Sequence, residues 1–75
     1  MPALNPQKLE DTVLALLGAF EFDGGRAWKR YDFDVMQALA EKGWIHDPRG
    51  RAESVQLTPE GLARARALAQ VLFGD

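Results

Sequence analysis

The stretch from Asp32 to Gly61 constrains the fold more than any other part of this 75-residue chain, because it holds signals for several consecutive elements. Asp32 is a preferred helix-capping residue, and apolar side chains follow it at helical spacing. Gly43 stands where a left-handed residue commonly ends a helix. Thr58 and Pro59 are a cap and a first-position proline, so another helix starts there. Two helices therefore bracket the segment between Gly43 and Thr58.

The segment between these helices predicts a hairpin. Residues 44–47 and 53–57 alternate in polarity like two half-buried strands. Between them, residues 47–50 place Asp, Pro and Gly at the positions that a type I turn prefers. The core face of this hairpin would carry its apolar members, Ile45, Val55 and Leu57.

The N-terminal part predicts one more helix, over residues 6–20, with Asn5 as its cap. Its core-facing stripe consists of apolar residues at helical spacing, Leu9, Val13, Leu16, Leu17 and Phe20. About eleven residues separate this helix from Asp32. They begin with a glycine turn at residues 23–25 and leave room for a turn or short helix around residues 26–30. We therefore expect one domain over residues 1–75, mainly α with a small β-hairpin.

The composition argues against catalysis and cofactor binding. The chain has no cysteine and one histidine, so we expect no disulfide, no metal site and no cofactor. Ser54, His46 and Asp47 are residue types of a nucleophilic unit, but adjacent strand residues point to opposite faces, which separates His46 from Asp47. No apolar run is long enough to span a membrane, and no secretion leader is evident. We expect a non-enzymatic, cytoplasmic protein with no membrane partner.

Cationic side chains indicate duplex DNA as one partner. Residues 24–51 carry six cations against four carboxylates, although the whole chain has a net charge of −2. Arginine and lysine bind phosphates, and a glutamine on the outer face of the second helix is suited to adenine. The predicted nucleic-acid-binding residues are Arg26, Lys29, Arg30, Gln37, Arg49 and Arg51. Asp34 and Glu41 share the outer face with Gln37 and would repel phosphates, which weakens this interpretation.

Two aromatic residues, Trp28 and Tyr31, are interleaved with the cations at positions 26–30. Aromatic rings beside cations can stack on bases. A small domain also needs large side chains to fill its core, and this favours anchoring for the two rings. For the cations, phosphate contact and simple solvation both stay open.

Apolar residues in the last helix indicate the alternative, a protein-interaction module that pairs with itself or with another protein. Val71 and Phe73 fall off the buried stripe of that helix. A domain of this size has a marginal core, so an apolar flank favours a dimer interface, unless Phe73 covers the protein's own core. Trp44, which the hairpin register turns outward, is a residue type enriched at interfaces. The predicted interaction residues are Trp44, Leu68, Val71, Leu72 and Phe73.

Two sequence words resemble a known fold signature. EKGWI at residues 41–45 and VQLTPEG at residues 55–61 resemble the helix, strand, wing, strand, helix pattern of winged-helix regulators of the multiple-antibiotic-resistance-regulator type. The whole chain is similar to an uncharacterised family of small bacterial proteins. That similarity also rests on the words RAWK (26–29), YDFD (31–34), DP (47–48), SV (54–55) and LT (57–58).

The resemblance implies a trimmed winged-helix-like domain in the order helix, short turn or helix, helix, strand, wing, strand, helix. The family has no assigned activity, so the resemblance adds an expectation of fold and little about function. The chain departs from a standard winged helix before Asp32, where a positioning helix should precede the recognition helix. This departure puts a DNA-reading role of the second helix in doubt.

Overall fold

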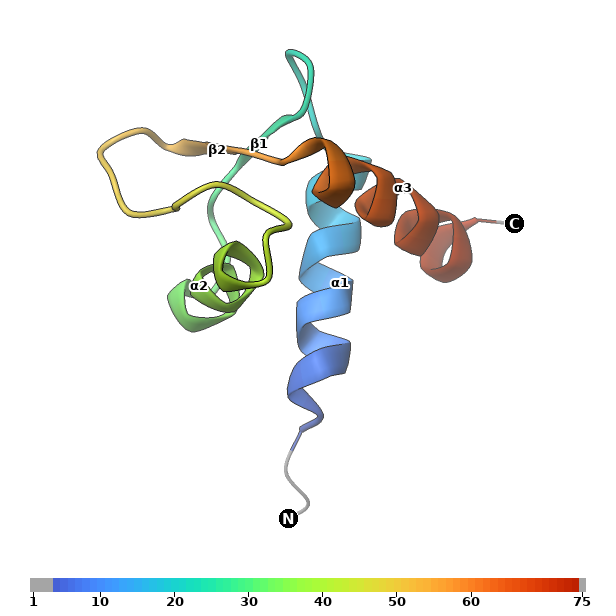
Figure 1. The fold of residues 1–75 in the computed structure, drawn as a ribbon. Helices are drawn as coiled ribbons and strands as arrows, with labels where there is room; N and C mark the ends of the chain where they lie inside the picture. The colour runs from blue at the N-terminus through green and yellow to red at the C-terminus, as the bar shows by residue number, and fades with distance from the viewer. Residues whose placement is uncertain (1–3, 75) are drawn as a thin grey trace.

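The computed structural model describes residues 4–74, which form five elements in the order α–β–α–β–α (Figure 1). The elements are α1 (Pro6–Ala19), β1 (Arg26–Trp28), α2 (Phe33–Glu41), β2 (Ser54–Gln56) and α3 (Pro59–Phe73). α1 lies in the centre, with α2 on one side and α3 on the other (Figure 1). The predicted small α+β class is confirmed.

The predicted helix starts are confirmed by their caps. Asn5 and Thr58 each accept a backbone N–H from three residues ahead, at 3.1 Å and 2.9 Å. Asp32 caps α2 in the same way at 3.2 Å. Each cap satisfies an N–H group that the first turn of a helix cannot pair internally.

The predicted end of α2 is also confirmed. Gly43 adopts a φ of +81°, the left-handed conformation expected at this position. The N–H of Gly43 donates to the carbonyl of Ala40 at 3.0 Å, and the N–H of Trp44 donates to the carbonyl of Leu39 at 3.0 Å. This pair of bonds is the Schellman motif, which turns the chain sharply toward β2.

The predicted hairpin is only partly formed, because β2 pairs along its whole length with β1, and residues 44–47 form no strand. Ala27 lies opposite Val55 in the two-stranded sheet. On the other edge of β2, residues 44–47 contribute a single bridge, between Ile45 and Leu57. The turn or short helix expected at residues 26–30 is therefore a strand instead. A three-residue strand is too short to display alternation, and its partner lies far away in sequence.

The loop of residues 47–53, called the basic loop below, is held by side chains and not by the predicted type I turn. Asp47 Oδ1 accepts the backbone N–H of Arg49 at 2.9 Å, which forms an Asx-turn. Lys29 Nζ donates to the carbonyls of Pro48 and Gly50 at 2.5 Å and 2.9 Å. The lysine that follows β1 thereby fixes a loop some twenty residues downstream.

The core lies between α1, α2 and the sheet. Its largest fully buried side chains are Leu14, Leu17, Met36 and Leu39. The hairpin residues expected on the core face, Ile45, Val55 and Leu57, are buried as predicted. The expected stripe of the first helix is only partly buried, because Leu9 is 42% exposed and Phe20 is 67% exposed.

Glycines allow α3 to approach its neighbours closely. A Cβ on Gly61 would stand 1.7 Å from the carbonyl oxygen of Trp44. A Cβ on Gly18 would stand 2.6 Å from the Cβ of Ala65, where α1 and α3 cross. Only a hydrogen in place of a side chain fits at either position.

Candidate functional site

Two of the predicted nucleic-acid-binding cations support the fold directly, and a third lies against an aromatic ring. The guanidinium of Arg26 donates to Ser54 Oγ across the sheet at 2.6 Å. Lys29 holds the basic loop through the two carbonyls described above. The guanidinium carbon of Arg30 lies 5.5 Å from the ring centre of Trp28, within cation–π range. Arg26 and Lys29 are therefore committed to internal contacts.

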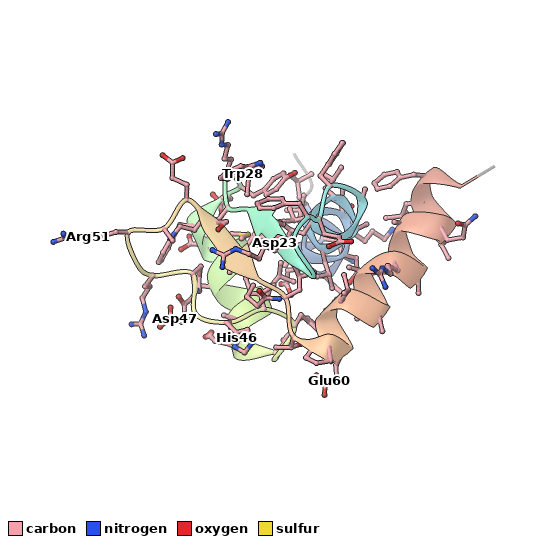
Figure 2. The ribbon with its side chains drawn as sticks, turned by 90° about the horizontal axis from the view of Figure 1, so that it is seen from above. Asp23, Trp28, His46, Asp47, Arg51 and Glu60 are labelled. Carbon is pink, nitrogen blue, oxygen red and sulfur yellow. The ribbon has the colours of Figure 1, made fainter. Side chains whose placement is uncertain are left out.

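The other two cations lie on the basic loop and differ in their surroundings. Arg49 forms an exposed ion pair with Asp47 at 2.9 Å. The hydrogen bonds from Arg49 lower the pKa of the Asp47 carboxyl to about 2, and the carboxylate raises the pKa of Arg49. Arg51 forms no hydrogen bond or ion pair with any residue in the 4–74 range. Figure 2 shows its side chain at the outer end of the loop, pointing away from the helices.

Gln37 does not present its amide as the sequence predicts. The residue is half-buried on α2, and its Oε1 atom is buried without a hydrogen-bond partner among the described residues. Bidentate recognition of adenine requires both the carbonyl oxygen and the NH₂ of the side-chain amide. Asp34 and Glu41 are exposed as predicted, so the accessible surface of α2 is acidic. Of the six predicted cationic and amide residues, Arg30 lines one surface hollow and Lys29 and Arg49 line another.

The predicted interaction residues of α3 line a groove against α1. Its volume is about 470 Å³. From α3 it is lined by Leu68, Val71 and Leu72, and from α1 by Lys8, Asp11 and Thr12. Val71 is 80% exposed and Leu72 is 48% exposed. We call this the α1–α3 groove.

The remaining two predicted interaction residues differ from each other. Phe73 is 50% exposed at the end of α3 and does not complete the protein's own core. Trp44 is half-buried, its ring lies 5.2 Å from the guanidinium carbon of Arg64, and its carbonyl accepts the backbone N–H of Thr58. Trp44 therefore joins α2 to α3. Its side chain was predicted to face outward and is only partly exposed.

Sequence reasoning missed an aromatic hollow between the end of α1 and β1. Its volume is about 310 Å³. Its apolar and aromatic lining consists of Leu16, Leu17, Phe20, Ala27, Trp28 and Tyr31. Arg30 completes the lining. The cations and aromatic residues at positions 26–31 were a signal for this hollow. Phe20 was assigned to the core, so it was not connected with Trp28 and Tyr31.

Three residues considered for catalysis make no common network. Ser54 Oγ is bonded to Arg26, and Asp47 is paired with Arg49. Among residues 4–74, no hydrogen bond joins either of them to the exposed His46. The same part of the chain gathers no group of three or more His, Asp or Glu side chains able to hold a metal ion. None of its helices has the length and apolar character needed to cross a bilayer.

The fold and these surfaces define a small α+β domain with one loop that carries Arg49 and Arg51 and with apolar concavities beside α1. The chain belongs to the DUF6429 family, a domain of unknown function, whose model matches residues 5–75. It is 39% identical over 70 residues to the uncharacterized protein y4hR of Sinorhizobium fredii, an alignment that covers 93% of this chain and 95% of that protein. No solved structure matches the chain. The similarity to a family of small bacterial proteins is thereby confirmed at the level of the family.

Proposed function

We propose that this protein is a non-catalytic interaction module that pairs with a second copy of itself through the α1–α3 groove. The observation that carries the proposal is the end of α3, where the consecutive residues Val71, Leu72 and Phe73 are 80%, 48% and 50% exposed. Val71 and Leu72 expose their apolar side chains at the groove, and Phe73 exposes its ring beside it. Exposed apolar side chains that gather in one place often mark an interaction surface.

The charges at the groove favour a second copy as the occupant. Lys8 and Asp11 lie on the same wall, so the groove carries both signs. In a two-fold dimer the same surface faces itself, and a patch of one sign would repel its copy. Here Lys8 of one protomer can approach Asp11 of its partner, a carboxylate that also pairs with Arg64 of its own chain at 3.3 Å. The apolar centre supplies affinity, and the charged rim sets the register.

The proposal is tested by changing Val71 to Glu. Because Val71 is 80% exposed in the monomer, the change leaves folding intact but places a carboxylate in the interface. Ala63→Glu is the matched control, since Ala63 is exposed on the same helix and does not line the groove. Light scattering after gel filtration should give a dimer for the native chain and for Ala63→Glu, and a monomer for Val71→Glu. Equal masses for the two variants would refute the interface.

DNA binding through the basic loop is the second candidate. The exposed Arg49 and Arg51 support it, as does the resemblance to a trimmed winged helix in which this loop would be the wing. The net charge of −2 and the acidic surface of α2 oppose it. If this reading holds, duplex DNA binds at low salt, weakens steeply as salt rises, and is lost in the double variant Arg49→Glu, Arg51→Glu. If the double variant still binds duplex DNA, the basic loop is not the DNA-binding surface.

A further inference from the structure

The aromatic hollow adjoins a second hollow, and Tyr31 lines both. The second has a volume of about 300 Å³ and is lined by Phe33 and Met36 of α2 and by part of the basic loop. Together we call them the aromatic groove. We propose that this groove binds an extended, acidic peptide segment of a partner protein, with one bulky apolar side chain in the hollow beside Trp28. The proposal does not depend on self-association, because the groove shares no lining residue with the α1–α3 groove.

The shape of the first hollow suits an apolar side chain. Its inner wall contains Leu17 and Ala27, which belong to the hydrophobic core. Phe20 and Trp28 also line it and are 67% and 47% exposed, so they are available to cover a guest. A volume of about 310 Å³ is at the lower end of the range for ligand sites and leaves room for one large side chain.

The charges around the groove select an acidic partner. Arg30 lines the first hollow. Lys29 and Arg49 line the second, where Lys29 is bonded to the loop carbonyls and Arg49 is paired with Asp47, so they add positive charge but Arg30 is the cation left to pair with a guest. Neither hollow is lined by a carboxylate, although the chain as a whole has a net charge of −2. Arg30 stands beside Trp28 without an ion pair among the described residues, so its guanidinium is open to a carboxylate.

The backbone at the groove favours an extended segment. Gly25 and Lys29 form ladder hydrogen bonds with the chain of β2, through Leu57 N–H and Glu53 carbonyl, each at 2.9 Å. The alternation of an antiparallel ladder then turns the N–H and carbonyl of Trp28 away from β2. These groups can pair with a peptide laid along the edge of β1.

A single-stranded nucleic acid fits the groove less well than a peptide. Base binding on an aromatic platform needs a ring with an open face. The Trp28 ring already has Phe22 at 4.9 Å between ring centres and Arg30 at 5.5 Å. The hollow between the rings is lined by aliphatic groups, which receive a side chain better than a polar base.

The test uses fluorescein-labelled heptapeptides with a central Leu, Phe or Trp and two Glu residues on each side, beside sets with Lys or Ser flanks. The full chain should bind the Glu-flanked peptides at least tenfold more tightly than the Lys-flanked ones by fluorescence anisotropy. In NMR spectra the Trp28 indole and Tyr31 amide signals should shift during the titration. Arg30→Glu, an exposed change, should weaken binding at least tenfold, and so should Phe20→Ser.

The matched control is Arg66→Glu, because Arg66 is an exposed arginine on α3 that lines neither hollow. This variant should bind the Glu-flanked peptides as the native chain does. Equal binding of Glu-flanked and Lys-flanked peptides would overturn the proposal, as would affinity unchanged by Arg30→Glu. An oligo-dT strand that competes for the same signals and binds more tightly than every peptide would overturn it in favour of nucleic acid. A monomeric chain that still binds the peptides would refute the proposed dimer alone.

Discussion

At Asp47, hydrogen bonds from the neighbouring Arg49 set the pKa of the side-chain carboxyl. The side chain and backbone N–H groups of Arg49 bond to the carboxylate and lower its pKa from 3.8 to about 2. A depressed pKa in the folded state means that the ionised carboxylate favours folding. The contribution is complete above pH 4 and is lost as the pH falls from about 4 toward 2.

This ionisation can be measured directly. An NMR titration of the Asp47 carboxyl should give a pKa near 2 in the native chain. In Arg49→Ala the pKa should return toward its ordinary value of 3.8, because both the hydrogen bonds and the positive charge of the side chain are removed. Arg51→Ala is the control, since Arg51 is on the same loop and has no contact with Asp47. A native value near 4 would mean that the pair does not persist in solution.

Gly61 provides a test of packing at a single residue. Gly61→Ala should destabilise the fold by about 3 kcal/mol, since the new Cβ would collide with the Trp44 carbonyl and backbone cannot easily move aside. Gly50→Ala is the control, because nothing lies within 4 Å of a Cβ at Gly50. Urea unfolding of the two variants should give well-separated midpoints. Similar midpoints would show that α3 sits farther from Trp44.

Residues whose roles are local could be predicted from the sequence, and residues whose roles depend on distant contacts could not. Asn5, Asp32 and Thr58 cap helices through bonds to residues three positions away, which the sequence displays. Gly61 is required by a carbonyl seventeen positions earlier, and its sequence context indicated only a helix start. Gln37 was placed by helical periodicity, which gives the direction of a side chain but not what covers it.

At the scale of elements, the starts of all three helices and the ends of α1 and α2 were predicted to within one or two residues, and the pairing in the sheet was not. α1 and α3 carry long periodic stripes with strong start signals, so their bounds follow from short-range chemistry. β1 has three residues and gains its structure from β2 across the chain. Only the hairpin was predicted, because its two expected strands are close in sequence and residues 26–28 gave no strand signal. Pro48 and the Asx-turn at Asp47 end the first expected strand after the bridge at Ile45.

The hydrogen bonds from Lys29, which follows β1, to the basic loop should restrict the motion of that loop. Lys29→Ala removes the donor to the carbonyls of Pro48 and Gly50, so the loop should gain motion and the fold should lose about 1 kcal/mol. Backbone ¹⁵N relaxation at residues 49–53 should report lower order parameters than in the native chain. Arg51→Ala, a truncation on the loop itself, should leave those parameters unchanged. Equal loop order in the two variants would contradict this restriction.

At the scale of the whole molecule, the candidate surfaces were predicted only in part. Val71 and Phe73 could be named because they fall off the buried helical stripe, whereas Leu72 belongs to that stripe and is nevertheless 48% exposed. The α1 wall of their groove could not, because the crossing of α1 and α3 depends on the contact between Gly18 and Ala65. The cations were selected by their residue type alone. Their contacts with Ser54, Trp28 and the loop carbonyls depend on β1, which was not predicted.

The central claim is that the exposed end of α3 is covered by a second copy of the chain. Sedimentation equilibrium of the native protein over a hundredfold range of concentration tests it most directly. The mass should rise with concentration from 8.3 kDa to twice that value and stop there, as closed two-fold pairing requires. A mass that stays at 8.3 kDa at every concentration would contradict it.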